Sequence, residues 1–105
     1  MSEEAPQAGA GVPAGAISKD LLIINKRGLH ARASAKFVQA VERFDAQVWV
    51  TRGGETVGGT SIMGLMMLAA GPGTTITVSA AGTDAEAALA AITDLVESKF
   101  NEEGT

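Results

Sequence analysis

The residues best suited to chemistry in this chain are Gly28-Leu29-His30-Ala31-Arg32, where an apolar run gives way to a helical pattern. His30 is the only histidine, and the chain has no cysteine and no tyrosine. Histidine is the side chain that ordinarily changes its charge near neutral pH, so it suits nucleophilic or acid–base work there. The first amides of a helix lack partners within the helix, and the helix dipole is positive there. An imidazole at that position, with one ring nitrogen open to water, is suited to carry a phosphoryl group.

The residues alone leave other interpretations of His30 open. A single histidine in a small domain is usually structural or simply solvated. A metal site would need carboxylates to complete its ligand set, because the chain offers no thiolate. A Ser-His-Asp triad is compatible with the composition, but the chain has no Gly-x-Ser-x-Gly elbow. We therefore expect no metal and no cofactor.

Charge is distributed unevenly around His30. The net charge of −4 argues against a general nucleic-acid-binding protein. Between Asp20 and Glu42, however, there is no acidic residue. A basic patch of this kind suits a phosphate and an acidic partner surface, although a solvated helix face is the simpler alternative. The basic residues of this interval are Lys26, Arg27, Arg32 and Lys36.

Two segments carry a family resemblance. Asn25–Ser34 (NKRGLHARAS) resembles the active-site loop of HPr, the histidine-containing phosphocarrier of the bacterial phosphotransferase system. Thr60–Met66 (TSIMGLM) is similar to the regulatory-serine region of the same family. The two segments align at matching separation without a gap, and the resemblance covers about residues 18–100. The family usually has proline where this chain has Ala33, and alanine is expected to loosen the entry to the helix slightly.

The resemblance implies a stoichiometric phosphocarrier rather than an enzyme that acts on a free small molecule. His30 would accept a phosphoryl group from enzyme I and pass it to an enzyme IIA domain, in sugar uptake or in a regulatory branch. Only a neutral imidazole has the lone pair for this attack. Arg32 would neutralise phosphate charge, because its planar guanidinium matches pairs of oxygen atoms. The backbone amides of Ala31, Arg32 and Ala33 would bind the phosphate, and Ser34 would cap or pack within the first turn.

Ser61 matches the regulatory phosphorylation site of the family, which an HPr kinase/phosphorylase modifies in organisms that have this kinase. Ser61 is also a plausible N-cap for a short helix. A phosphate at that position would be favoured by the helix dipole, so it would not unfold the helix. It would instead place a charge of about −2 beside an apolar surface.

The stretch from Thr56 to Thr83 contains no charged residue. A short helix within it cannot bury every face against one sheet. We expect Leu65 and Leu68 to lie in the core. Methionine is flexible and polarizable, which suits a surface that meets several partners. The matching family positions imply that Ile62, Met63 and Met66 form a docking patch beside the active histidine.

Hydrophobic periodicity predicts the elements that position these residues. A helix from Ala31 to about Phe44 would place His30 at or beside its N-cap. Gly53-Gly54 suits a two-residue hairpin turn, Gly71-Pro72 would stop the short helix, and Thr83–Glu86 forms a capping box for the last helix. The predicted strands cover 21–24, 48–51, 55–59 and 75–80, and the predicted helices 31–44, 62–70 and 84–96.

The element order β-α-β-β-α-β-α predicts an α/β (α+β) open-faced sandwich, a four-stranded antiparallel sheet with three helices on one face. The uncovered face would carry Leu22, Ile24 and Trp49. The 105 residues suffice for one domain. Residues 1–16 are rich in Gly, Ala and Pro and predict a disordered tail. We expect the HPr-like domain at 17–100 and a flexible C-terminus at 101–105.

Composition restricts the setting in which the chain works. Without cysteine there is no disulfide, and the acidic N-terminus has no hydrophobic run, so we expect a cytoplasmic protein. The longest apolar stretch, near residues 62–70, falls short of the roughly 20 residues needed to span a bilayer. We expect a monomer without membrane insertion. The runner-up hypothesis is an interaction module of the same fold in which His30 is never phosphorylated, and a small enzyme is a third.

Overall fold

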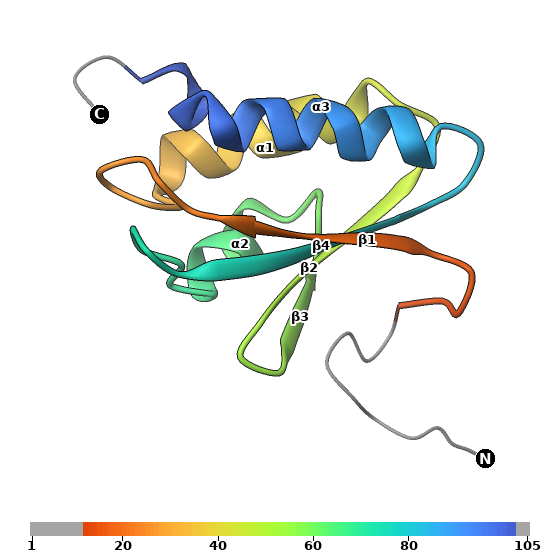
Figure 1. Ribbon diagram of the computed structural model, residues 1–105, viewed down its shortest axis with the longest axis horizontal. Coiled ribbons are helices and arrows are strands. Elements are labelled where there is room, and N and C mark those ends of the chain that lie inside the picture. The colour runs from red at the N-terminus through yellow and green to blue at the C-terminus, as the bar shows by residue number, and fades with distance from the viewer. Residues whose placement is uncertain (1–11, 103–105) are drawn as a thin grey trace.

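The computed structural model describes residues 12–102 and has the predicted order of elements, with one short turn added (Figure 1). Its strands and helices are β1 (Ile17–Leu22), α1 (Ala31–Glu42), β2 (Gln47–Arg52), β3 (Glu55–Gly58), α2 (Ile62–Met67), β4 (Thr75–Ala81), α3 (Ala85–Glu97) and the turn η1 (Lys99–Asn101).

The four strands form one antiparallel sheet in the order β1-β4-β2-β3. The central strand β4 pairs with β1 on one side and with β2 on the other, where Val78 lies opposite Val50. The predicted hairpin between β2 and β3 is confirmed. Gly53 and Gly54 both have positive φ, +59° and +86°, as a two-residue turn of matching twist requires.

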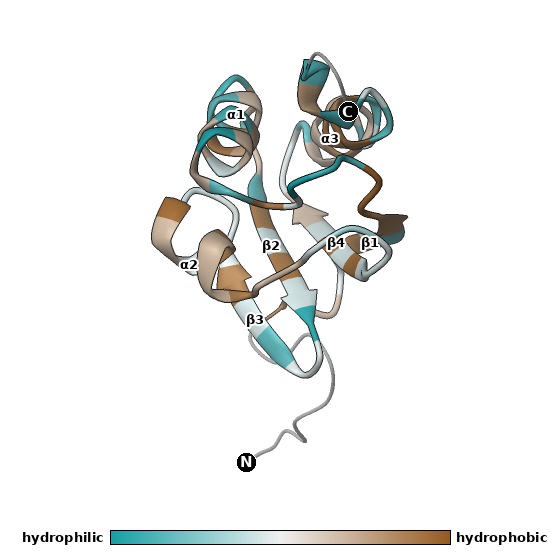
Figure 2. Cartoon of the chain, turned by 90° about the vertical axis from the view of Figure 1, so that its left-hand side faces the viewer, coloured by the Kyte–Doolittle hydropathy of each residue, from teal (hydrophilic) through white to brown (hydrophobic). Residues whose placement is uncertain are grey.

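The helices cover one face of this sheet and leave the other open. Figure 1 and Figure 2 show α1 and α3 side by side over the sheet, while α2 packs beside α1 and against β3. The core lies between the two layers. Its largest fully buried apolar side chains are Phe37, Phe100, Ile23, Leu65, Ile76, Ile92, Val50, Val78 and Val96.

The open face carries exposed apolar side chains and a row of hydroxyl groups. Leu22 and Ile24 are 53% and 40% exposed, as the alternation predicted, and Trp49 is half-buried. The Oγ atoms of Ser18 and Ser79 lie 2.8 Å apart across β1 and β4. Paired hydroxyls of this kind stabilise a sheet face that no helix covers.

Two elements, β1 and α2, differ from the prediction by three residues or more at one end. Strand β1 runs over Ile17–Leu22 rather than 21–24, because its pairing with β4 is made by the backbone and includes polar residues. Asp20 within it accepts a hydrogen bond from the Thr77 hydroxyl at 2.7 Å. Helix α2 ends at Met67, before Gly71-Pro72, and Ala69 already has a φ of +53°. Apolar periodicity continued beyond the point at which the backbone leaves the helix.

The predicted capping box of the last helix is wrong. The N-cap of α3 is Asp84 rather than Thr83, and its side chain makes no cap hydrogen bond. Its Oδ2 accepts instead from the backbone N–H of Asp45 at 2.8 Å. The carboxylate therefore ties the loop before β2 to the start of α3, a contact between residues 39 positions apart.

No helix within residues 12–102 is both long enough and apolar enough to cross a bilayer.

Candidate functional site

The loop between β1 and α1 holds His30 in place. Gly28 has a φ of +66°, and a Cβ atom there would lie 2.4 Å from the carbonyl oxygen of Ala70. That same oxygen accepts a hydrogen bond from the Leu29 amide at 3.0 Å. The loop therefore packs directly against the chain that follows α2, and only glycine fits at position 28.

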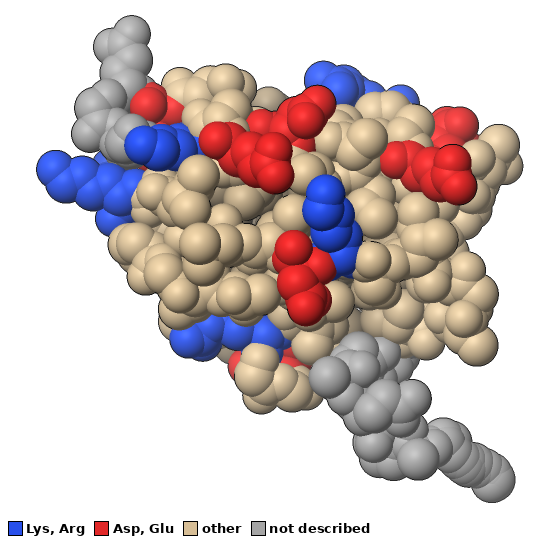
Figure 3. Space-filling view, in the orientation of Figure 1, with Lys and Arg blue, Asp and Glu red and all other residues tan. Residues whose placement is uncertain are grey.

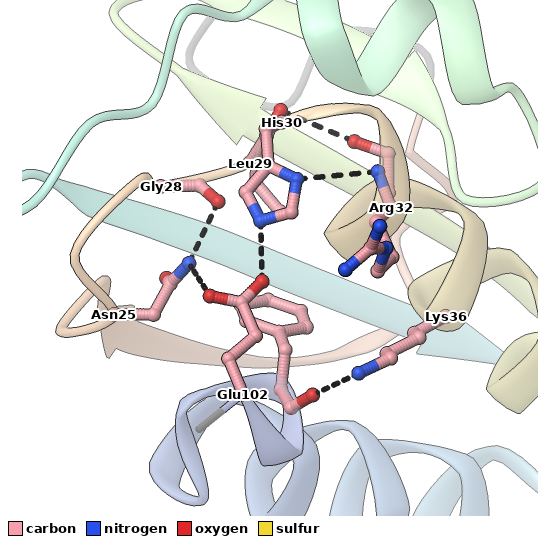
Figure 4. A network of polar contacts seen from close by, with 9 residues as sticks. Asn25, Gly28, Leu29, His30, Arg32, Lys36 and Glu102 are labelled. Carbon is pink, nitrogen blue, oxygen red and sulfur yellow. Dashed lines mark hydrogen bonds and ion pairs between the residues drawn. The ribbon is translucent and has the colours of Figure 1, made fainter. Parts of the chain in front are cut away.

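His30 is the N-cap of α1, which confirms its predicted position. Its carbonyl oxygen accepts the first helical hydrogen bond, from Ser34 at 2.8 Å. Its Nδ1 atom accepts a hydrogen bond from the backbone N–H of Arg32 at 3.2 Å (Figure 4). Within residues 12–102 the amides of Ala31 and Ala33 make no hydrogen bond. The positive end of the helix thus faces one nitrogen of the ring.

The other nitrogen faces the C-terminal segment. Nε2 of His30 is hydrogen-bonded to Oε2 of Glu102, and the side chains of the two residues are only 16% and 10% exposed. The ring is therefore more covered than the sequence predicted. Both ring nitrogens have polar partners, the Arg32 amide at Nδ1 and the Glu102 carboxylate at Nε2.

Asn25 connects the loop to Glu102. It is fully buried, and its Nδ2 donates to the Gly28 carbonyl at 2.8 Å and to Glu102 Oε1 at 3.3 Å (Figure 4). Ser34, also buried, donates through its hydroxyl to the Leu29 carbonyl at 3.2 Å. Ser34 packs within the first turn, as predicted, and both side chains stiffen the entry to α1.

The turn η1 brings Glu102 to the site. Lys99, Phe100 and Asn101 all have positive φ, from +56° to +59°, a conformation that costs roughly 1–2 kcal/mol per residue. The buried Phe100 ring fixes this turn in the core, and Lys36 Nζ donates to the Phe100 carbonyl at 2.6 Å. Of the end at 101–105 that the sequence predicted to be flexible, Asn101 and Glu102 have a described position, whereas 103–105 lie outside the described residues.

The carboxyl group of Glu102 is held in its charged form. Burial raises the pKa of Glu102, but hydrogen bonds from His30 and Asn25, and the charges of His30 and Lys36, outweigh this effect. The net result is a pKa below the ordinary value of a glutamate.

Basic side chains surround this network. Lys26, Arg27 and Arg32 are exposed, and Lys36 is half-buried. Figure 3 shows lysine and arginine side chains at the end of the molecule where the β1–α1 loop lies. Within residues 12–102 the Arg32 guanidinium makes no hydrogen bond or ion pair. It can therefore turn toward an anion bound at the N-terminus of α1.

Ser61 is the N-cap of α2, as predicted, and its Oγ accepts from the Gly64 amide at 2.9 Å. The side chain is exposed. Leu65 and Leu68 are only 0% and 3% exposed, which confirms their predicted place in the core. Helix α2 lies beside α1, so its outer surface adjoins the site (Figure 2). The exposed apolar residues of α2 are Ile62 (40%), Met63 (69%), Met66 (40%) and Met67 (72%).

Sequence reasoning missed Asn25 and Glu102. Asn25 lies within the segment that carries the loop motif, but its type gave no reason to expect full burial. Glu102 lies 72 residues from His30 along the chain, in a segment with no periodicity, and no local signal indicates the contact.

Comparison with known proteins shows the family and the fold of the chain. The family model described as "PTS HPr component phosphorylation site" matches residues 17–98. The phosphocarrier protein HPr of Neisseria meningitidis is 50% identical over 86 residues, which cover 82% of this chain and 97% of that protein. Two crystal structures of HPr from Thermoanaerobacter tengcongensis are also similar. HPr-C-His has a TM-score of 0.79 and 45% identity, and covers 83% of this chain and 98% of its own. The structure described as an HPr dimer has a TM-score of 0.66 and 46% identity, with coverages of 78% and 94%.

Proposed function

The chain belongs to the HPr phosphocarrier family, a component of the phosphotransferase system, and from this we propose that His30 is its phosphoacceptor. The observation that carries the proposal is the position of the ring. His30 caps α1 with Nδ1 directed at the first amides of the helix. A phosphoryl group on Nδ1 would meet N–H donors and the positive end of the dipole.

The transfer follows from this geometry. The Nδ1 lone pair attacks the phosphorus of a phosphohistidine on enzyme I. A new N–P bond forms while the N–P bond of the donor breaks, and its electron pair returns to the donor ring. The hydrogen bond from the Arg32 amide is at the long end of the usual range, so the lone pair is readily released. Passing the group to an enzyme IIA domain repeats the same steps in the opposite direction.

Three amides and one guanidinium stabilise the phosphoryl group in this proposal. The backbone amides of Ala31, Arg32 and Ala33 donate hydrogen bonds to its oxygens, and the Arg32 guanidinium pairs with its negative charge. Position 33 matters here, because the proline that is usual in the family has no N–H. Alanine therefore adds a donor to the site that relatives with proline lack.

The test of the phosphoacceptor is incubation with phosphoenolpyruvate and the host's enzyme I. We expect an acid-labile, base-stable phosphate that is absent from His30→Ala and unchanged in Ser61→Ala. Label that persists in His30→Ala would refute the assignment and would favour an interaction module in which His30 is not phosphorylated.

Arg32→Ala tests the role of the guanidinium. A charge-assisted hydrogen bond contributes roughly 1.5–3 kcal/mol, so we expect transfer to slow roughly 10- to 100-fold while His30 can still be phosphorylated. Rapid-quench kinetics measures the rate. Arg43→Ala, at the other end of α1, removes the same charge and serves as the control. Equal rates in the two variants would remove Arg32 from the mechanism.

We further propose that Ser61 is a regulatory site for an HPr kinase/phosphorylase, and that Ile62, Met63 and Met66 dock enzyme I and enzyme IIA domains. The exposure of these residues beside the site supports this role. The cytoplasm is the proposed location, in sugar uptake or a regulatory branch.

We also propose that the chain works as a monomer. Light scattering after size exclusion measures this directly, and a stable dimer is the contrary result.

A further inference from the structure

Given the proposed function, on which this inference rests, we propose that Glu102 is a positioning residue. Its carboxylate holds the proton of the neutral His30 ring on Nε2, so that Nδ1 stays unprotonated and keeps its lone pair for phosphoryl transfer. The residue belongs to the C-terminal segment, which η1 brings to the ring (Figure 4).

The hydrogen bonds around the ring specify one tautomer. A neutral imidazole has one N–H and one lone pair. The Arg32 amide can only donate, so Nδ1, which it contacts at 3.2 Å, must be the acceptor. The proton then resides on Nε2, and the partner there is a carboxylate oxygen of Glu102, which accepts and does not donate when charged. With the opposite tautomer, two donors would face each other at Nδ1 and a lone pair would face a carboxylate at Nε2.

The carboxylate is itself fixed from several sides. Asn25 donates to its second oxygen, Oε1, at 3.3 Å. Lys36 of α1 secures the preceding backbone through the Phe100 carbonyl at 2.6 Å and contributes a positive charge nearby. With Glu102 only 10% exposed, its geometry does not depend on a freely moving surface side chain.

The same contact assists the chemistry of both transfers. When Nδ1 bonds to phosphorus, the ring keeps its Nε2 proton and gains a positive charge, which the Glu102 carboxylate faces directly. When the phosphoryl group leaves, the N–P electron pair returns to Nδ1. The ring then departs as a neutral imidazole that needs no further proton. An orienting carboxylate on the second nitrogen of a reacting histidine has this effect in serine proteases, where it holds the tautomer and stabilises the imidazolium.

Two substitutions separate the hydrogen bond from the charge. Glu102→Ala removes both, whereas Glu102→Gln keeps a carbonyl acceptor for Nε2–H and removes only the charge. The control is Glu42→Gln, an exposed glutamate at the last residue of α1. It lies about 17 Å from the first residue of that helix, because eleven residues rise about 1.5 Å each.

The first measurement is the ¹⁵N NMR spectrum of the His30 ring at a pH where it is neutral. We expect a protonated Nε2 and a bare Nδ1 in the wild type, in Glu42→Gln and in Glu102→Gln, and a mixture of tautomers in Glu102→Ala. A role confined to stability would lower the melting temperature and leave this spectrum unchanged.

The second measurement is the rate of phosphorylation by enzyme I, with the fold of each variant checked by its amide spectrum. We expect Glu102→Ala to slow phosphorylation on the order of 10-fold, Glu102→Gln to be intermediate and Glu42→Gln to match the wild type. A wild-type tautomer and rate in Glu102→Ala overturn the inference. If the wild type itself is not phosphorylated on His30, the proposed function fails, whereas the NMR result still decides whether Glu102 sets the tautomer.

Discussion

At the scale of single residues, the site depends on positions that contribute no chemistry of their own. Gly28 determines whether the β1–α1 loop can close against the chain after α2. Asn25 determines whether that loop and Glu102 stay together. Neither residue would be chosen from its type as a candidate for phosphoryl transfer. The position of the His30 ring nevertheless depends on both of them.

Gly28→Ala is expected to destabilise the fold by more than about 2 kcal/mol. Positive φ costs alanine roughly 1–2 kcal/mol, and the new Cβ would also meet the Ala70 oxygen at 2.4 Å. Gly53→Ala is the matched control, because Gly53 has a similar φ of +59° and no atom within 4 Å of an added Cβ. Urea unfolding measures both variants, and equal losses would show that the close contact is unimportant.

The charge of Glu102 predicts a dependence of stability on pH. Because the folded state lowers the pKa of this carboxyl group, its stabilisation is present above the unfolded pKa and is lost as pH falls through the folded pKa. Glu102→Gln should therefore be less stable than the wild type near pH 7, by roughly 1 kcal/mol. The difference should shrink steadily below about pH 4.5. Denaturation curves at pH 7 and in acid measure it, and a constant difference would contradict the prediction.

At the scale of elements, α2 combines a serine N-cap with an exposed apolar surface. Ser61 begins the helix, and four exposed apolar side chains follow within six residues. Helix α2 is short and packs beside α1. A charge added at its N-cap, Ser61, would therefore lie on the same surface as the exposed apolar side chains of α2, and the core would not be altered.

Ser61→Asp is expected to weaken binding of enzyme I several-fold with little loss of stability, because aspartate also caps helices well. Ser61→Ala should do the reverse: it costs about 1 kcal/mol of stability through the lost cap and leaves binding near the wild-type value. Calorimetric titration and thermal unfolding distinguish the two variants. Unchanged affinity in Ser61→Asp would count against regulation at this position.

At the scale of the whole molecule, local patterns predicted most of the fold. Period 3.6 located α1, period 2 located β2 and β4, and two glycines located the hairpin. The prediction was weaker where structure comes from distant partners. The polar half of β1 is a strand because β4 pairs with it, and Asp84 bonds to Asp45 rather than to its own helix.

The candidate site divides in the same way. The position of His30 at the helix N-cap follows from a motif and a periodicity within twenty residues of sequence. The partner of its other nitrogen does not, because Glu102 arrives after a left-handed turn that no composition rule indicates. The packing of Phe100 in the core and the hydrogen bond from Lys36 to the Phe100 carbonyl explain why the chain returns to the ring at that point.

The reach of Glu102 has a practical consequence for work on this protein. The described chain begins and ends on opposite sides of the molecule (Figure 1), and only its C-terminal end touches the imidazole. Affinity handles, fluorescent fusions and surface tethers are best attached ahead of β1. Cleavage by a protease after Lys99 would separate the ring from its carboxylate and would also remove the buried Phe100 side chain from the core.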